Sequence, residues 1–244
     1  MKLSIVTVCY NPPLDSLKKT VESVVSNMRL ALVDDENELE YIIIDGGSSI
    51  SILSYLNQEV CALTDLNVEL ISESDEGIYD AMNKGIKKSN HDWIIFMNAG
   101  DTFATVDTLT KISCFLEKDC CVLYGDMLCN GKLFKAHPLS YIERGIIMAC
   151  HQSMFFNRKL LGDSLIYDDS YKVYSDYELV VRICKVFPLG LKYVDIPISN
   201  YEGGGISDKI SYQKRKDKYK ILFRYYGVAG ILKAIFHWLE TRIK

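Results

Sequence analysis

The chain has 244 residues, of which 48% are hydrophobic, and a formal net charge of −4 at pH 7. This length and composition suffice for one sizeable buried core in a single α/β domain. The acidic balance argues against nucleic acid as the main partner, because proteins that bind it usually carry a basic excess. The charge is uneven, however, since residues 209–244 hold ten Lys or Arg against two acidic residues.

Signals for export and for membrane spanning are absent from the sequence. The first residues lack the long apolar region of a signal peptide, and no stretch reaches the roughly 20 apolar residues that a membrane span needs. We therefore expect a cytoplasmic protein. The cysteines form no C-x-x-C pair, so neither a zinc site nor a redox motif is indicated, and reduced, mostly buried thiols are expected. They are Cys9, Cys61, Cys114, Cys120, Cys121, Cys129, Cys150 and Cys184.

Strand-like apolar runs alternate with amphipathic segments through the first part of the chain. Strands are predicted at Leu3–Cys9, Tyr41–Ile44, Val68–Ile71 and Trp93–Met97. A helix is expected after the first strand and another over Ile78–Lys88. This alternation is typical of a parallel, doubly wound sheet, in which ligands bind beyond the carboxyl ends of the strands.

The second part of the chain predicts shorter and more varied elements. A helix over Thr105–Leu116 precedes several short strand-like pieces, which indicate a mixed sheet. We divide the chain into a catalytic domain, residues 1–205, and a basic helical tail, residues 206–244. The remaining predicted elements are strands at Val122–Gly125, Leu133–Ala136, Met154–Phe156 and Leu191–Val194, a helix over Asp176–Val186 and a glycine loop at Gly203–Gly205.

Two aspartates follow predicted strands. Asp45 ends the second strand and Asp101 lies just past the fourth, each in a turn with glycine, which lets a ligand approach the backbone closely. Mg²⁺ and Mn²⁺ prefer oxygen ligands, so neighbouring strand ends suit one shared site. Either residue could instead be an ordinary turn aspartate whose carboxylate bonds the local backbone.

An acidic cluster, residues 73–76, precedes the helix predicted at 78–88. Acids at this position favour the helix dipole, so Glu76 is either a cap or a ligand. Asp80 and Lys84 have the i, i+4 spacing of a surface ion pair. Alternatively, Asn83 and Lys84 face a bound ligand.

A third group of polar residues lies around position 176. Ser175 and Glu178 have the spacing of a capping box, which would begin a helix. Asp176 then lies in the first turn, where a helix start and a catalytic acid or base account for it equally well. His151-Gln152 ends a strand-like stretch, and a lone His is more often packed or hydrogen-bonded than a ligand.

Six segments, taken in order, resemble the family 2 glycosyltransferases of the GT-A fold, particularly the bacterial enzymes that build surface polysaccharides and O-antigen repeats. The resemblance spans about residues 1–205 and is most specific in the long third segment. It implies an α/β, Rossmann-like, mostly parallel sheet with flanking helices and a C-terminal helical extension. The segments are Thr7–Asn11, Ile44–Ser48, Ser72–Gly85, Asn98–Asp101, His151-Gln152 and Ser175–Glu178.

The resemblance also implies roles for single residues. Asp176 would be the general base, and Asn98–Asp101 would occupy the place of the family's metal-binding Asp-x-Asp motif, which implies Mn²⁺ or Mg²⁺. Asn98 and Gly100 replace two carboxylates of the commoner pattern, so Asp101 is the one acidic ligand left. His151 and Gln152 are expected on the acceptor or donor-sugar side. The nucleotide-sugar would be bound by Thr7, Tyr10, Asn11, Asp45, Asp75, Lys84 and Asn98.

The implied reaction is an inverting, in-line transfer of one sugar from a UDP-sugar to a saccharide acceptor linked to polyprenyl diphosphate. Lys84 and the metal would stabilise the departing diphosphate. The Gln-x-x-Arg-Trp motif of processive relatives is missing, which favours a single addition. Two alternatives stay open: a nucleotide-sugar-binding protein without turnover, and a nucleotidyltransferase, although no Gly-rich basic loop follows the first strand.

The C-terminal segment Ile221–Ile243 carries apolar residues at helical spacing, directly after a basic stretch. Such a segment can lie in a membrane interface or pack on the core of its own domain. Gly227 and Gly230 could divide it into two helices. We expect the tail to hold the enzyme, as a peripheral protein, on the cytoplasmic face of the inner membrane.

Overall fold

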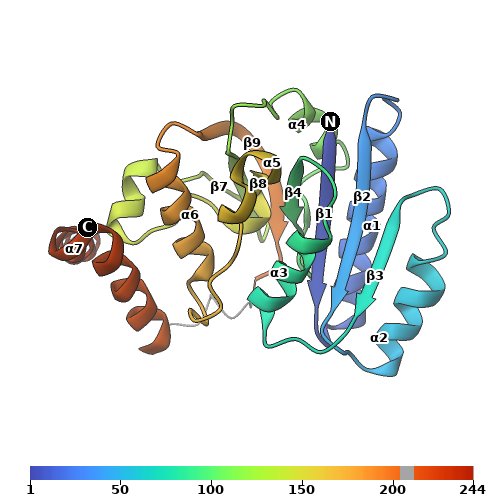
Figure 1. Ribbon diagram of the computed structural model, residues 1–244, viewed down its shortest axis with the longest axis horizontal. Coiled ribbons are helices and arrows are strands. Elements are labelled where there is room, and N and C mark those ends of the chain that lie inside the picture. The colour runs from blue at the N-terminus through green and yellow to red at the C-terminus, as the bar shows by residue number, and fades with distance from the viewer. Residues whose placement is uncertain (204–211, 244) are drawn as a thin grey trace.

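The computed structural model describes residues 1–203 and 212–243 (Figure 1). Within them, one nine-stranded sheet has the order β3-β2-β1-β4-β8-β6-β9-β5, with β7 paired to β6 outside this path. Its first part is parallel, as predicted, because β1 pairs with both β2 and β4, and β2 pairs with β3. These strands are β1 (Lys2–Cys9), β2 (Glu38–Asp45), β3 (Val68–Ser72) and β4 (Trp93–Phe96).

The other part of the sheet is mixed, which was also predicted. β8 runs antiparallel to β4 and β6, whereas β9 runs parallel to β6 and antiparallel to β5. β9 is much longer than the predicted strand because it pairs with β6 up to Tyr201 and, on its other edge, with β5 at Ser199 and Asn200. The strands are β5 (Thr102–Phe103), β6 (Val122–Cys129), β7 (Lys132–Phe134), β8 (Met154–Asn157) and β9 (Leu191–Tyr201).

Helices cover both faces of the sheet, so its central strands are buried on both sides. In β1, Ile5 packs into one hydrophobic core and Val6 into the other. Alternate residues of a strand point to opposite faces, which explains why these strands are continuous apolar runs. The longer helices are α1 (Leu14–Ala31) and α4 (Thr108–Ser113) on one face, and α3 (Ile78–Lys88) and α6 (Ser175–Val186) on the other.

Short helices connect these elements. α4 is only half as long as the predicted helix because Thr105 and Thr108 hydrogen-bond each other in a turn that delays its start. The remaining segments are α2 (Ile50–Tyr55), η1 (Leu56–Val60), η2 (Leu139–Arg144), η3 (His151–Ser153), α5 (Arg158–Leu161) and η4 (Gly162–Ser164).

The predicted capping box of α6 is wrong. The Ser175 hydroxyl has no hydrogen-bond partner, and no side chain caps the helix. Glu178 is buried and contacts Arg182 and the hydroxyl of Tyr225 on the C-terminal helix instead. Glu178 therefore serves the packing of α6 against the C-terminal helix, and the capping-box spacing does not indicate a cap here.

The prediction for the cysteines holds only in part. All eight thiols are free, but only Cys9, Cys120 and Cys121 are buried. Cys61 and Cys114 are exposed, so the expectation of mostly buried thiols is wrong.

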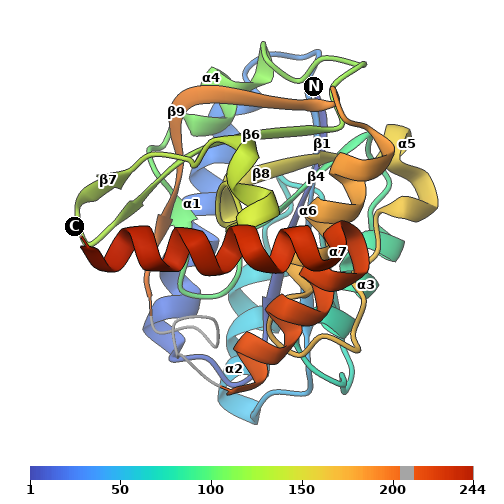
Figure 2. The ribbon, with the colours of Figure 1, turned by 90° about the vertical axis from the view of Figure 1, so that its left-hand side faces the viewer.

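The C-terminal helix α7 (Tyr212–Ile243) consists of two helices that meet at Gly227 (Figure 2). Gly227 has φ +60° and ψ −152°, a conformation that suits glycine, whereas Gly230 lies inside the second helix. Ile221 and Leu222 of the first part are fully buried against the body. The predicted domain boundary at residues 205/206, with Gly204 and Gly205, lies outside the described residues.

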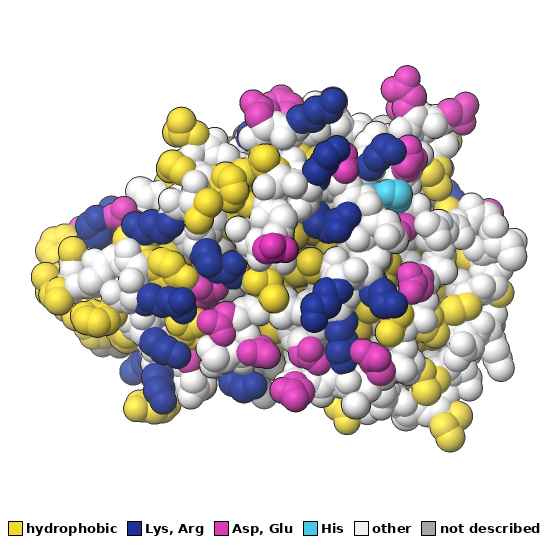
Figure 3. Space-filling model, viewed as in Figure 1, with side chains coloured by type: hydrophobic (Ala, Val, Ile, Leu, Met, Phe, Trp, Pro, Cys, Tyr) yellow, Lys and Arg dark blue, Asp and Glu magenta, His cyan; other side chains and the backbone are white. Residues whose placement is uncertain are grey.

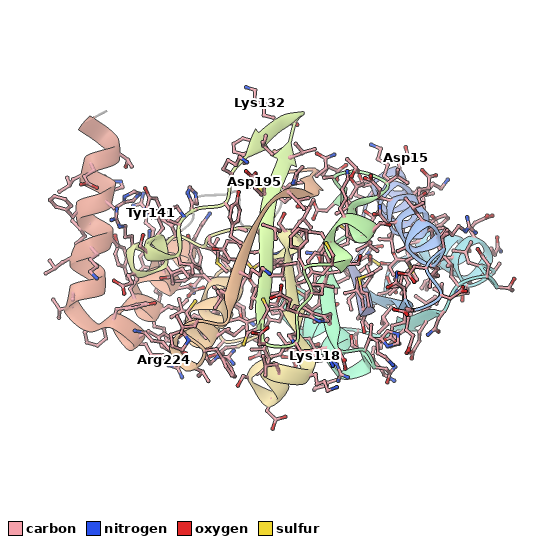
Figure 4. All side chains as sticks on the ribbon, turned by 90° about the horizontal axis from the view of Figure 1, so that it is seen from above. Asp15, Lys118, Lys132, Tyr141, Asp195 and Arg224 are labelled. Carbon is pink, nitrogen blue, oxygen red and sulfur yellow. The ribbon has the colours of Figure 1, made fainter. Side chains whose placement is uncertain are left out.

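The second part of α7 contacts η2. Tyr141 of η2 stacks edge-on against His237, and Glu143 pairs with Lys233. Figure 4 shows Tyr141 beside α7, at the opposite end of the molecule from Asp15 on α1. No helix in the described parts of the chain is both long enough and apolar enough to cross a membrane.

The Thr7 hydroxyl joins three strands, so we predict that Thr7→Val destabilises the fold. It donates to the carbonyl oxygen of Met97 at 2.7 Å and lies 2.9 Å from the Tyr41 hydroxyl. Valine would leave these buried groups unpaired, at a cost of about 1–2 kcal/mol in the free energy of unfolding. Urea denaturation measures this loss. Thr110→Val, on the exposed side of α4, is the matched control, and an equal effect of both changes would contradict the prediction.

Candidate active site

A cleft of about 930 Å³ opens beyond the carboxyl ends of β1 and β4. Ligands of parallel α/β sheets bind at this place. The cleft brings together seven of the residues predicted from the sequence, whereas Thr7, Asp45, Asp75 and Lys84 do not line it. The seven are Tyr10, Asn11, Asn98, Asp101, His151, Gln152 and Asp176.

The loop after β1 presents an aromatic ring to the cleft. Asn11 has φ +46°, a left-handed conformation that Asn tolerates better than most residues. It is held there because its N–H donates to Ser48 Oγ at 2.7 Å and its side-chain oxygen accepts from the Ser49 N–H at 2.8 Å. Tyr10 is consequently 66% exposed, which leaves its ring free to contact a ligand.

Asp45 braces the neighbouring turn. Its carboxylate is fully buried and accepts hydrogen bonds from the Ser72 hydroxyl at 2.7 Å and from the N–H groups of Gly47 and Ser48. Burial raises the pKa of Asp45, but these hydrogen bonds outweigh burial, and the pKa lies below its usual value. Asp45 therefore makes the local hydrogen bonds of an ordinary turn aspartate.

Lys84 holds the loop that precedes α3. Its ammonium lies 2.7 Å from the Ser74 carbonyl oxygen and 3.2 Å from the carboxylates of both Glu73 and Asp80, so the predicted Asp80–Lys84 pair is present. Asp80 also accepts from the Glu76 N–H, so it ties the loop before α3 to the first turn of that helix. The charge of Lys84 is thus matched by two carboxylates outside the cleft.

Asp75 lies at the rim of the cleft. It accepts a hydrogen bond from the Gly77 N–H at 2.9 Å. A Cβ atom on Gly46 would overlap the Asp75 carboxylate and reach within 3.4 Å of the Tyr10 ring. Tyr10, Gly46 and Asp75 therefore lie close together, and a side chain at position 46 would require the Asp75 carboxylate to move.

Asn98 and His151 form a hydrogen-bonded pair in the cleft wall. The side-chain nitrogen of Asn98 lies 2.7 Å from His151 Nε2. Burial lowers the pKa of His151 to about 4, so the ring is neutral at pH 7 and its Nε2 can accept this bond. The side-chain oxygen of Asn98 is buried and has no hydrogen-bond partner in the described parts of the chain.

Asp101 is buried between two elements. One carboxylate oxygen accepts from Gln152 Nε2 at 2.5 Å, and the other accepts from the N–H of Glu202 at 3.0 Å. Gln152 directs its amide nitrogen at the carboxylate, and its buried oxygen has no hydrogen-bond partner within residues 1–203 and 212–243. Glu202, which follows β9, also lines the cleft.

Asp176 stands at the start of α6, on the opposite wall. Burial raises its pKa to about 6, although the Tyr177 N–H, at 2.7 Å, and the charge of Lys214 oppose this rise. A carboxylate with a pKa near 6 is a competent proton acceptor at neutral pH. Lys214, in the first turn of α7, lines the same cleft and lies 5.8 Å from the centre of the Tyr174 ring.

Glu202 and Lys214 have no role in the sequence-based prediction. Lys214 was assigned to the basic tail, and residue 202 belongs to no recognised segment. Only the sheet topology indicates a role for Glu202, because the pairing of β9 with β5 brings it beside Asp101.

The described side chains of the cleft offer few ligands for a divalent cation. Among residues 1–203 and 212–243, no three His, Cys, Asp or Glu side chains converge on a metal position. Mg²⁺ and Mn²⁺ are often bound by only one or two carboxylates together with substrate phosphates. Asp101 and the unpaired Gln152 oxygen fit a cation that shares its remaining ligands with a bound diphosphate.

Residues 4–164 match the family Glycosyl transferase family 2. The chain belongs to this family. Among curated family 2 relatives, a PGL/p-HBAD biosynthesis glycosyltransferase of Mycobacterium bovis is 28% identical over 180 residues, covering 71% of this chain and 69% of the relative. An uncharacterized glycosyltransferase of Mycobacterium tuberculosis is 28% identical over 193 residues, covering 75% and 69%. The comparisons support the family, not the O-antigen pathway in particular.

Solved structures confirm the GT-A fold of this family 2 chain. Staphylococcus aureus TarS, residues 1–349 with UDP-GlcNAc, aligns with a TM-score of 0.67 and 14% identity, covering 96% of this chain and 70% of that one. The chain spans only 38% of a longer TarS chain. The mannosyltransferase PcManGT from Pyrobaculum calidifontis, with GDP-Man and Mn²⁺, aligns with a TM-score of 0.59 and 15% identity, covering 80% and 54%.

The buried carboxylate of Asp176 lowers the free energy of unfolding by an amount that depends on pH. Its pKa is about 6 in the fold and about 3.9 in an unfolded chain, so the folded protein loses stability as pH rises between these values. Asp176→Asn removes the charge and is predicted to raise the free energy of unfolding by about 1–2 kcal/mol at pH 8 and by almost nothing at pH 4.

Urea denaturation at the two pH values tests this prediction. Asp163→Asn, an exposed position on η4, is the control and should change the unfolding free energy by less than about 0.5 kcal/mol at either pH. A destabilised Asp176→Asn protein at pH 8 would contradict the assigned burial cost.

Proposed function

We propose that this family 2 protein transfers one sugar from a UDP-sugar to an acceptor hydroxyl, with inversion at the anomeric carbon. The observation that carries the proposal is the cleft itself: a carboxylate with a raised pKa, Asp176, shares it with the strand-end residues Tyr10, Asn98 and Asp101. The fold neighbours whose titles name UDP and UDP-GlcNAc support a uridine diphosphate donor.

The proposed chemistry is one displacement. The acceptor oxygen forms a bond to the anomeric carbon while the bond from that carbon to the diphosphate oxygen breaks, and its electron pair leaves with UDP. Asp176 takes the acceptor proton, and its raised pKa makes it a stronger base than an ordinary aspartate. No covalent intermediate with the protein is required.

Donor binding is assigned to the opposite wall. The exposed ring of Tyr10 offers a stacking face for the base, with Asn11 and Asp75 beside it. Lys214, which reaches the cleft from the side of Asp176, is the cation that we place nearest the diphosphate, whereas Lys84 is paired outside the cleft. His151 and Gln152 border the space for the transferred sugar.

We propose Mn²⁺ or Mg²⁺ as the cofactor, held by Asp101 and the donor. When bound, such a cation would neutralise negative charge on the diphosphate. The neighbours solved with Mn²⁺ support this choice, although their likeness to this chain is one of fold.

The proposed acceptor is a saccharide carried on polyprenyl diphosphate, in the synthesis of a bacterial surface polysaccharide such as O-antigen. The relatives named as PGL/p-HBAD biosynthesis glycosyltransferases support sugar transfer, and this acceptor rests on the resemblance described in the sequence analysis. Family membership favours sugar transfer over the nucleotidyltransferase alternative.

UDP release tests the proposed reaction. The protein is offered a panel of UDP-sugars with Mn²⁺ and a GlcNAc or GalNAc acceptor linked to a lipid diphosphate. We expect turnover with one donor, a loss of about 10²–10⁴-fold in kcat for Asp176→Asn, and a fall of kcat/KM below an apparent pKa near 6. Asp163→Asn should keep full activity.

The outcomes separate the alternatives. UDP binding without turnover on any acceptor favours the binding protein, and a lack of UDP binding refutes the donor assignment. Pyrophosphate release in place of UDP would favour the nucleotidyltransferase.

We further propose that α7 places the enzyme on an anionic lipid surface as a peripheral protein. Its outward side, called here the apolar face of α7, gathers at one end of the molecule, with Lys and Arg nearby (Figure 3). Basic side chains next to exposed apolar ones suit the anionic interface of a membrane. The apolar face consists of Phe223, Val228, Leu232, Ile235, Phe236, Trp238 and Leu239, each at least 41% exposed.

Sedimentation with lipid vesicles tests this placement. The protein should bind vesicles that contain phosphatidylglycerol, and added salt should weaken binding because the charges are screened. Replacing both Leu232 and Phe236 with Glu should weaken binding at least about tenfold, since apolar area is lost. Leu189→Glu, 98% exposed outside α7, is the control. A dimer in solution, lost in the double variant without any vesicle binding, would refute the proposal.

A further inference from the structure

A second carboxylate lies beside Asp101, from a distant part of the chain. Glu202, just after β9, donates its N–H to Asp101 at 3.0 Å, which brings residues 101 positions apart into contact. Its own carboxylate accepts from the Ser16 hydroxyl at 2.9 Å. Both acidic residues line the cleft.

The Glu202 carboxylate lies where a side chain of residue 100 would begin. A Cβ atom on Gly100 would overlap Glu202 Oε2, and Gly100 has φ +106°, which side chains other than glycine rarely adopt. Gly100 thus makes room for a carboxylate that arrives from β9.

An independent observation indicates that this pair faces a ligand. Gln152 is 3% exposed, and its amide nitrogen is committed to Asp101 at 2.5 Å. Its oxygen is buried and has no hydrogen-bond partner among the residues that the structure describes. An unpaired buried oxygen is costly, and a cation would satisfy it.

We propose that Glu202 is a second carboxylate ligand of the divalent cation, beside Asp101, with the Gln152 oxygen as a neutral ligand. This inference rests on the proposed function for the identity of the cation. Two carboxylates that line one cleft bring negative charge to it, and a hard cation, which accepts oxygen ligands, would neutralise this charge.

Ser16 is a positioning residue for this site. It lies on α1 and donates to Glu202 Oε1, which leaves Oε2 next to Gly100. Such outer contacts orient metal ligands, and losing one typically weakens metal binding by about 10-fold or more. Ser16→Ala should therefore act in the same direction as a change of Glu202, but less strongly.

Mn²⁺ binding provides a test that does not depend on turnover. Free Mn²⁺ is measured by electron paramagnetic resonance while MnCl₂ is titrated into the full chain with saturating UDP. We expect Glu202→Gln to weaken Mn²⁺ binding by about 100-fold and Ser16→Ala by about 10-fold. Asp15→Asn, an exposed acid on α1 next to Ser16, should leave it unchanged.

Three controls make the result decisive. UDP affinity in EDTA should be equal in all variants, since Glu202 acts through the metal. Glu202→Asp, with a shorter carboxylate, should lose less affinity than Glu202→Gln. Circular dichroism melting verifies that each variant is folded.

The outcomes distinguish this inference from the proposed function. Unchanged Mn²⁺ affinity in folded Glu202→Gln, or no Mn²⁺ binding by the unaltered chain with UDP, overturns the inference even if sugar transfer is observed. Mn²⁺ binding that requires Glu202, without any transferase activity, supports the inference and refutes the proposed reaction instead.

Discussion

The architecture depends on β1, which is hydrogen-bonded to parallel neighbours on both sides and packed between helices on both faces. Polar ligand-binding groups cannot lie along such a strand without costly burial. They are therefore displaced to its carboxyl end, where the chains of β1, β2 and β4 leave the sheet together. Tyr10, Asp45 and Asn98 are neighbours for this reason, although they lie far apart in sequence.

Much of this half of the molecule could be predicted because its information is local. Buried parallel strands need continuous apolar runs, and the polar turns that follow them stand out in the sequence. The prediction was less precise where tertiary contacts decide the outcome. The length of β9 is set by its pairing with β6 and β5, and Glu178 points to Tyr225 on another helix rather than to a cap.

The residues of the candidate site differ in the same way in whether the sequence could predict them. Residues within recognisable segments, such as Asn98, Asp101 and Asp176, could be proposed from the resemblance, and all three lie in one cleft. Glu202 and Lys214 could not, because each reaches the cleft through a long-range connection that leaves no local pattern. Thr7 and Asp45 show the opposite case: their segments match the family, yet their side chains are buried and hydrogen-bonded within the fold.

The kink at Gly227 separates two parts of α7 that have different surroundings. The helix before it contributes Lys214 to the cleft and buries Ile221 and Leu222, so it is a structural wall of the catalytic unit. The helix after it carries most of the exposed apolar side chains of α7 and touches the body mainly through η2. A single glycine therefore separates the two helices. The outer helix can differ in sequence, length or attachment without moving the part of α7 that lines the cleft.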